Sequence, residues 1–141
     1  MVEKGLLGDF EVVAVADIST DAKYFAYQLK YDSIHGKFPG TLSTEKSNPS
    51  VEEDDVLIVN GHKIKCVMAT KAPDLLPWKE LAIQYVNEST CLFTDSEKAA
   101  LHLKAGAKKV IITAPGKGGV KTLVIGVNQN EYDPNAHHIV S

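Results

Sequence analysis

The segment FEVVAVAD, residues 10–17, decides the fold class of this chain. Its side chains are apolar almost without interruption up to Ala16, which is typical of a parallel β-strand covered on both faces. The strand ends at Asp17, and Ser19-Thr20-Asp21 then offers side chains that cap a helix. A buried strand followed at once by a helix predicts an α/β domain.

The strongest local signal outside this segment is a β-hairpin. Residues 56–67 contain two apolar strands joined by Asn60-Gly61, and this pair supplies both positive φ angles of a type I′ turn. Residues 41–46 add a predicted third, edge strand. We therefore expect a hairpin insertion over about residues 41–72.

The rest of the chain continues the alternation of strands and helices. The further predicted elements are a helix at 22–30, a strand at 83–86, a helix from the capping box Thr94-Asp-Ser-Glu97 to Lys104 with Gly106 behind it, and strands at 109–113 and 123–127. This order predicts one domain over residues 1–141, built on a mainly parallel sheet with a hairpin insertion.

Composition excludes several classes of partner. The formal net charge is −3 without any basic block, which argues against a nucleic-acid partner. No apolar run approaches the ~20 residues that span a bilayer, and the start resembles no signal peptide, so we expect no membrane partner and an intracellular location. All 15 basic residues are lysine, so a bound anion meets backbone N–H groups, helix ends or lysine, never a guanidinium. Cys66 and Cys91 fit no metal pattern and are expected to be free thiols.

The ends of the predicted parallel strands are the candidate site, because ligands of open α/β sheets bind there. Asp17 can accept hydrogen bonds from both ribose hydroxyls of an adenosine group, or it can simply cap the following helix. The local sequence supports these two roles equally. Ser89-Thr90 suits phosphate or ribose, or ordinary turn chemistry. Phe93 can stack on adenine or fill the core, and Thr113 can bind a ligand hydroxyl or end its strand.

Other motifs carry no chemistry. Gly116-Lys-Gly-Gly119 lacks the spacing of a P-loop and leads into a predicted strand, so it is interpreted as a flexible connector. His137-His138 has no further ligand at metal spacing within its element. Cys91 has no histidine base nearby in the sequence, so no nucleophilic catalytic set is predicted.

Taken together, these segments resemble phosphorylating glyceraldehyde-3-phosphate dehydrogenases. The resemblance covers nearly the whole chain and is carried by VVAVAD at 12–17, YFAYQLKYDSIHGKF at 24–38, VNGHKI at 59–64, DLLPW at 74–78, ESTCLFTD at 88–95, AGAKKVIITAP at 105–115, IGVNQNEYD at 125–133 and HHIVS at 137–141. Its segment Tyr24-Phe-Ala-Tyr27 is most similar to the glycosomal and bacterial-type members. It implies a partial Rossmann-type NAD-binding domain.

The resemblance also implies what to expect at either end. The family's glycine-rich turn and first central strand would precede this chain, and its catalytic cysteine would follow Ser141. We therefore expect a fragment, without catalytic residues, that binds the adenosine half of NAD weakly. In the full enzyme, glyceraldehyde 3-phosphate is oxidised and phosphorylated to 1,3-bisphosphoglycerate.

The resemblance implies NAD as the cofactor and assigns a role to single residues. Those expected along the cofactor are Asp17 at the ribose, Ile18 against adenine, Lys71 in place of an arginine, Ser89, Thr90, Phe93, and Thr113 near the nicotinamide ribose. Cys91 occupies the position of a family glycine. Either this copy is released from tight cofactor binding, or the turn has a negative φ here; in both cases Cys91→Gly is not expected to weaken nucleotide binding.

Two further interpretations remain open at this point. Without a central strand, the strands at 10–16 and 83–89 would pair directly with each other or associate between copies, as the homotetrameric family also suggests. The chain would then be an assembly or interaction fragment without nucleotide binding. An independent enzyme that uses Cys91 is the third and weakest interpretation. We expect a cytoplasmic location, with the glycosome as the alternative.

Overall fold

The computed structural model of the chain describes residues 10–18, 21–50, 52–69 and 72–141. The chain divides into two compact units, and the division falls between Lys71 and Ala72. The first unit is the part up to Lys71, and the second unit is the part from Ala72 onward.

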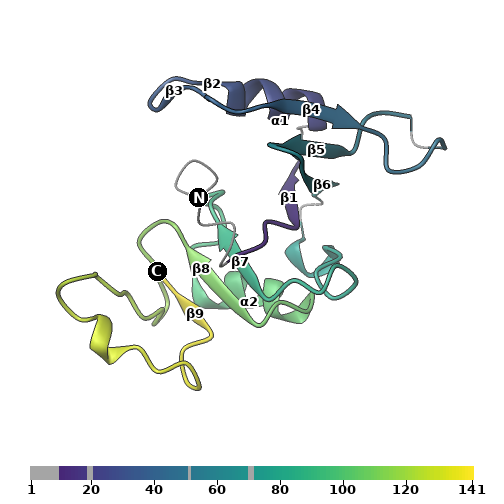
Figure 1. Cartoon of the computed structure of the whole chain (residues 1–141). Coiled ribbons are helices and arrows are strands. Elements are labelled where there is room, and N and C mark those ends of the chain that lie inside the picture. Colours follow the sequence, from purple (N-terminus) through teal and green to yellow (C-terminus); the bar gives the residue numbers. More distant parts are fainter. Residues whose placement is uncertain (1–9, 19–20, 51, 70–71) are drawn as a thin grey trace. The chain divides into compact units, whose positions relative to one another are not determined.

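The first unit contains a four-stranded mixed sheet, one helix and a short two-stranded ribbon (Figure 1). Its elements are β1 (Ala14–Asp17), α1 (Ala22–Lys30), β2 (Tyr31–Asp32), β3 (Gly36–Lys37), β4 (Leu42–Glu45), β5 (Val56–Val59) and β6 (His62–Met68). The strand order is β1-β6-β5-β4, with β1 parallel to β6 and the other neighbours antiparallel. The α/β class with parallel pairing and a hairpin is confirmed.

The hairpin has the turn that its sequence predicts. Asn60 and Gly61 have φ angles of 51° and 82°, and they join β5 to β6 in register Val59↔His62. The Asn60 side chain also accepts a hydrogen bond from the Thr41 backbone N–H at 2.8 Å. This bond ties the predicted edge strand β4 to the hairpin.

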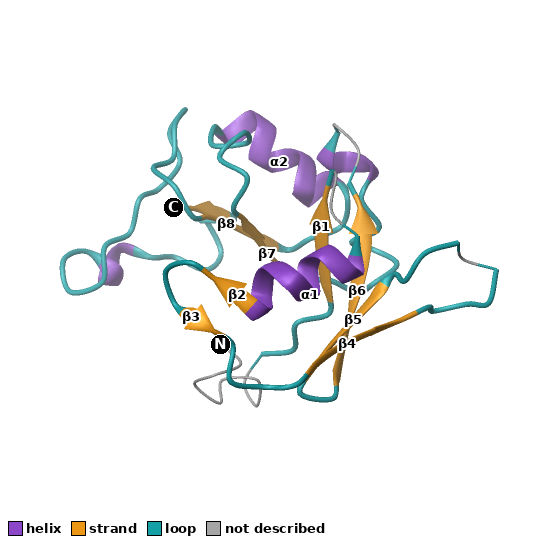
Figure 2. Ribbon diagram, turned by 90° about the horizontal axis from the view of Figure 1, so that it is seen from above, coloured by secondary structure: helices purple, strands orange, loops and turns teal. Residues whose placement is uncertain are grey.

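Helix α1 covers one face of this sheet (Figure 2). Ala22 is fully buried, and Phe25 and Ala26 pack beside it, as the helical spacing predicts. The buried core of the first unit consists of Ala22, Phe38, Leu57, Val59, Ile64 and Cys66. Cys66 is therefore a core side chain and a free thiol, and burial raises its pKa.

The cap of α1 decides between the two roles considered for Asp17. Asp21 is the N-cap residue, and its carboxylate accepts a hydrogen bond from the Tyr24 backbone N–H at 2.7 Å. Asp17 closes β1 four positions earlier, so capping α1 is not its role.

The second unit contains a three-stranded parallel sheet. Its elements are η3 (Pro73–Leu75), β7 (Tyr85–Glu88), α2 (Ser96–Lys104), β8 (Lys109–Ile112), η4 (Gln129–Glu131) and β9 (Ile139–Val140), with strand order β7-β8-β9. Helix α2 packs on this sheet (Figure 1), where Ala99, Val110 and Ile112 form a buried cluster. The parallel pairing brings the carboxyl ends of β7 and β8 side by side.

Helix α2 ends as predicted but begins one residue later than its capping box suggests. Asp95, not Thr94, is the N-cap residue, and its carboxylate accepts from the Lys98 backbone N–H at 2.9 Å. Aspartate caps at least as well as threonine, so the cap shifts to the neighbouring side chain. Gly106 follows the helix with a φ of 113°, a conformation that favours glycine.

The strand predicted at 123–127 is wrong. The segment forms a turn in which the Asn128 side chain accepts from the Val124 backbone N–H at 2.7 Å, and Gly126 has a φ of 87°. Ile125 is 86% exposed, so the apolar run is not buried in a sheet. The third strand of the sheet is instead β9, only two residues long.

The edges of the two sheets bear on the predicted pairing of the strands at 10–16 and 83–89. Within the described ranges, β1 pairs with β6 and β7 pairs with β8, so each lies at the edge of its own sheet. Pairing of β1 with β7 stays a prediction. Association between copies stays a prediction.

Both α-helices have nine residues. Over the part of the chain that the structure covers, neither these nor the 3₁₀ turns are long and apolar enough to cross a bilayer.

Candidate functional site

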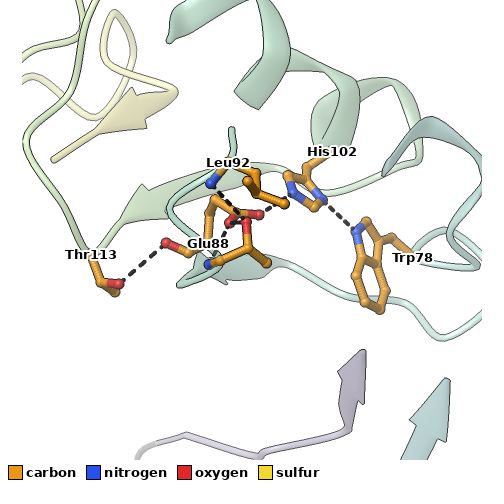
Figure 3. A network of polar contacts seen from close by, with 6 residues as sticks. Trp78, Glu88, Leu92, His102 and Thr113 are labelled. Atoms are coloured by element: carbon orange, nitrogen blue, oxygen red, sulfur yellow. Dashed lines mark hydrogen bonds and ion pairs between the residues drawn. The ribbon is translucent and has the colours of Figure 1, made fainter. Parts of the chain in front are cut away.

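One predicted site residue, Thr113, is bonded to the end of β7 at the carboxyl edge of the second unit's sheet. Glu88 is the last residue of β7, and Ile112, its partner in the register, is the last of β8. Thr113, the residue after β8, donates its backbone N–H to the Glu88 carbonyl at 3.0 Å and its hydroxyl to the same oxygen at 3.3 Å. The end of β7 and the residue after β8 are therefore joined by hydrogen bonds (Figure 3), and Ser89 and Thr90 follow Glu88 directly in the chain.

The Glu88 carboxylate shapes the turn that follows β7. Its Oε1 atom accepts a hydrogen bond from the Thr90 backbone N–H at 2.7 Å and another from the Thr90 hydroxyl. The Thr90 hydroxyl oxygen in turn accepts from the Leu92 backbone N–H at 3.2 Å. The turn is therefore folded around one carboxylate.

The other oxygen of Glu88 contacts a buried histidine of α2 (Figure 3). His102 Nε2 lies 2.9 Å from Glu88 Oε2, and both residues are 4% exposed. The Trp78 indole N–H donates to His102 Nδ1 at 3.0 Å. Because an indole nitrogen only donates, Nδ1 is an acceptor and His102 is neutral, with its proton on Nε2. Glu88 and His102 form a charge-assisted hydrogen bond rather than an ion pair.

These contacts set the charge state of Glu88. Burial raises the pKa of Glu88, but hydrogen bonds from His102 and Thr90 outweigh burial, so the pKa lies below its ordinary value. The carboxylate is ionised at neutral pH and acts only as an acceptor.

Phe93 belongs to the same cluster. Its ring meets the His102 ring edge-on, with centroids 6.2 Å apart and an interplanar angle of 85°. Phe93 is only half-buried, so it supports His102 from one side and keeps part of its ring exposed.

Cys91 has a φ of 62°, the left-handed conformation that glycine adopts more easily. The alternative of a negative φ at this turn is therefore wrong. The thiol is exposed, and a Cβ in this conformation costs about 1–2 kcal/mol.

The remaining predicted residues belong to the first unit. Asp17 ends β1, is half-buried, and its carbonyl accepts from the Ala69 backbone N–H at 2.8 Å. Ile18 follows it and is 62% exposed, as a side chain that packs against a ligand would be. Lys71 lies outside the described residues.

The glycine-rich segment at 116–119 does not form a phosphate cradle. The Lys117 carbonyl accepts from the Ser96 backbone N–H at 3.3 Å, and the Gly118 carbonyl accepts from the Ser96 hydroxyl at 2.7 Å. The segment is therefore anchored to the start of α2 and presents carbonyl oxygens to it. This bonding also occupies N–H groups that an anion would need.

Two hollows of the second unit lie away from these strand ends. They measure about 620 and 260 Å³, and their walls come mainly from the loop 119–123 and from residues 132–140. None of the predicted site residues lines them. The candidate site therefore rests on the hydrogen-bonded strand ends. Within the described ranges, no group of three or more histidine, cysteine or carboxylate side chains is placed to hold a metal.

Comparison with known proteins identifies the family. Residues 6–96, more than half of the chain, match the family described as glyceraldehyde 3-phosphate dehydrogenase, NAD binding domain. The chain belongs to this family. The resemblance in the sequence is thereby confirmed, and NAD is the cofactor expected for the family.

Curated relatives match over nearly the whole chain. The chain is 56% identical over 142 residues to the glycosomal glyceraldehyde-3-phosphate dehydrogenase of Crithidia fasciculata, covering 100% of this chain and 39% of the relative. It is 49% identical to the enzyme of Treponema pallidum, over 100% of this chain and 40% of the relative. It is 52% identical to the glyceraldehyde-3-phosphate dehydrogenase of Thermotoga maritima, over 94% of this chain and 37% of the relative. The chain thus spans about two fifths of the length of these curated relatives.

Sequence reasoning missed Glu88 and His102 as site residues. Glu88 is the first residue of the segment ESTCLFTD at 88–95, but the sequence of a buried strand does not show which side chain its last residue contacts. The available signal was a histidine on the apolar face of the predicted helix 94–104, one turn after Ala99.

Proposed function

We propose that this chain forms part of the NAD-binding domain of a glyceraldehyde-3-phosphate dehydrogenase and that its strand ends hold the adenosine half of NAD. The observation that carries the proposal is the joined edge of β7 and β8, where Thr90 is bonded to the Glu88 carboxylate, Thr113 is bonded to the Glu88 carbonyl, and Ser89 lies between Glu88 and Thr90 in the chain. Ligands of parallel sheets bind at such carboxyl edges. Residues 1–141 are proposed to act as one domain with a hairpin insertion at 41–72.

The proposed roles follow from the exposed groups. Asp17 accepts hydrogen bonds from the ribose hydroxyls, and the cap contact of Asp21 supports this role because it removes the competing one. In the first unit, the exposed side chain of Ile18 packs against adenine. In the second unit, the open part of the Phe93 ring offers an apolar surface along the cofactor. Lys71 supplies a positive charge near the adenine.

At the other strand ends, backbone groups and hydroxyls face the cofactor. Ser89 is exposed, and in the described part of the chain its hydroxyl has no hydrogen-bond partner. Thr113 lies where the resemblance implies the nicotinamide ribose. The whole enzyme oxidises and phosphorylates glyceraldehyde 3-phosphate. We assign no role in this chemistry to the described residues.

The test is titration calorimetry of the chain with ADP-ribose. We expect weak binding, and Asp17→Asn lowers the affinity by roughly 10-fold or more, because hydrogen bonds to a charged group contribute about 1.5–3 kcal/mol. Asp21→Asn is the matched control, since asparagine caps a helix as well as aspartate. Absence of ADP-ribose binding, or equal affinity of the Asp17→Asn variant, contradicts the proposal.

A second candidate function is assembly. The observation that favours it is that β1 and β7 each lie at the edge of their sheet within the described residues, and edge strands favour pairing with another chain. We propose self-association through these edges, which light scattering and amide exchange measure. A monomer whose β1 and β7 edge amides exchange freely contradicts it.

We propose a cytoplasmic location, with the glycosome as the alternative. The 56% identity to a glycosomal relative supports the alternative. Imaging of the tagged chain in its own cells distinguishes the two compartments.

A further inference from the structure

Both threonines of the candidate site depend on one residue. Thr113 donates to the carbonyl of Glu88, and Thr90 donates to its carboxylate. Glu88 is 4% exposed, so it does not itself contact a ligand at the surface. It lies behind the turn at 89–92 and holds it from the inside.

The hydrogen-bonding capacity of Thr90 is largely used within the protein. A threonine hydroxyl has one donor and two acceptor positions. The donor is directed to Glu88, and one acceptor position receives the Leu92 N–H. The Thr90 backbone N–H is also bonded to Glu88, at 2.7 Å. Thr90 therefore has no N–H or O–H left to donate to a ligand.

We propose that Glu88 is a positioning residue for the nucleotide site and that Thr90 acts through it, as part of the turn rather than as a ligand contact. The carboxylate fixes the turn at 89–92, and the turn presents Ser89 to the adenosine part of the cofactor. This proposal rests on the proposed function.

The position of Glu88 is fixed from the opposite side. His102 donates to its second oxygen, and Trp78 in turn donates to His102. A buried carboxylate with donors on both oxygens has one favourable orientation, because any other leaves buried polar groups without partners. The hydrogen bonds that link Trp78, His102, Glu88 and Thr90 thereby connect the packed helix α2 to the end of β7.

Amide exchange of the full chain tests the local part of the proposal. In Glu88→Gln, the Thr90 amide exchanges about 10-fold faster or more, because its hydrogen bond to a charged acceptor is lost. The Leu92 amide also exchanges faster, because its acceptor, the Thr90 hydroxyl oxygen, is no longer held by Glu88. Protection in β8 and α2 changes little. Glu80→Gln, an exposed glutamate outside the network, is the matched control. Unchanged protection at Thr90 and Leu92, or an equal loss throughout the second unit, overturns the positioning role.

A double-mutant cycle on ADP-ribose affinity tests the rest. Because Thr90 is exposed, Thr90→Val leaves the core intact even if Glu88→Gln perturbs it. We expect each variant to bind roughly 10-fold more weakly and the double variant to bind no worse than either, since both remove the same coupling. Thr90→Ser keeps the hydroxyl and restores binding.

The outcomes separate the two proposals. If the two losses of ADP-ribose affinity multiply to about 100-fold in the double variant, the Thr90 hydroxyl contacts the ligand directly. This outcome overturns the positioning role alone. If the unmodified chain does not bind ADP-ribose at all, the proposed function fails and the positioning role with it.

Discussion

Trp78 donates its indole N–H to Nδ1 of His102 over 3.0 Å, and this contact fixes which nitrogen of the histidine carries the proton. Nε2 must then be the donor, and it faces Glu88 at 2.9 Å. A tryptophan near η3 thus determines how a carboxylate at the end of β7 is held. The direction of donation runs from Trp78 through His102 to Glu88.

This direction of hydrogen-bond donation predicts that a second substitution restores the contact that Glu88→Gln disrupts. In Glu88→Gln, the glutamine side chain has two possible orientations. Either its NH₂ group faces the His102 N–H, so that two donors meet, or its oxygen faces His102 and no longer accepts from Thr90. Trp78→Phe removes the indole N–H, so the His102 proton can move to Nδ1 and Nε2 can accept from the glutamine. We therefore expect the double variant Glu88→Gln/Trp78→Phe to recover slow exchange at the Thr90 amide.

The control for this rescue is Trp78→Phe alone. It leaves His102 Nδ1 without its donor and lowers the free energy of unfolding by about 1–3 kcal/mol, measured by urea denaturation. If the double variant exchanges at Thr90 as fast as Glu88→Gln does, the assigned proton position is wrong.

The turn itself contains a strained residue. Cys91 has a φ of 62°, so Cys91→Gly removes a Cβ penalty of about 1–2 kcal/mol while the unfolded chain gains roughly 0.5–1 kcal/mol of entropy. We expect the free energy of unfolding to rise by up to about 1.5 kcal/mol, measured by thermal unfolding, with no loss of ADP-ribose affinity. Cys91→Ala keeps the Cβ and removes the thiol, so it should leave stability unchanged. Equal stabilisation by both variants would show that the thiol, not the backbone, is responsible.

How far the sequence predicts this structure depends on how local each signal is. The Asn60-Gly61 turn, helix α1 and Gly106 are set by neighbouring residues, and all three are confirmed. The apolar run at 123–127 has the composition of a strand, but the Asn128 side chain closes it into a turn. Composition alone cannot show this, because the deciding bond comes from a residue outside the run.

The residues of the candidate site also differ in how far the sequence predicts them. Ser89, Thr90 and Thr113 are predictable because they follow strands, and ligands bind at strand ends. The contact between Glu88 and His102 is not, because it joins residues 14 positions apart and exists only when α2 packs on the sheet that contains β7 and β8. The hydroxyl pattern at the surface can be predicted from sequence, but the buried network behind it cannot.

In the first unit, the charge on Asp55 gives a prediction about acid stability. Partial burial raises the pKa of Asp55, but hydrogen bonds from Lys65 and Ser47 outweigh it and lower the pKa to about 2. Because the folded pKa lies below the ordinary value of 3.8, the stabilisation is fully present above about pH 4 and is lost as the pH falls toward 2.

We therefore expect Asp55→Asn to lower the free energy of unfolding by about 1 kcal/mol at pH 6, after allowance for solvent screening of the partly exposed Lys65. Urea titrations of both proteins from pH 6 to pH 2 should show this difference narrowing below pH 4. Glu53→Gln, an exposed carboxylate of the same loop, is the control. A difference that is constant over this range would mean that the ion pair does not stabilise the fold.

The two neighbouring hydroxyls after β7 should behave differently. Ser89 is exposed and its hydroxyl has no partner within the described residues, whereas the Thr90 hydroxyl is bonded to Glu88. Ser89→Ala should therefore weaken ADP-ribose binding by roughly 2- to 10-fold, the value of one neutral hydrogen bond, without changing the urea midpoint. Thr90→Val should lower both affinity and local amide protection. Equal affinity of Ser89→Ala and the unmodified chain would mean that this turn contacts the nucleotide through its backbone alone.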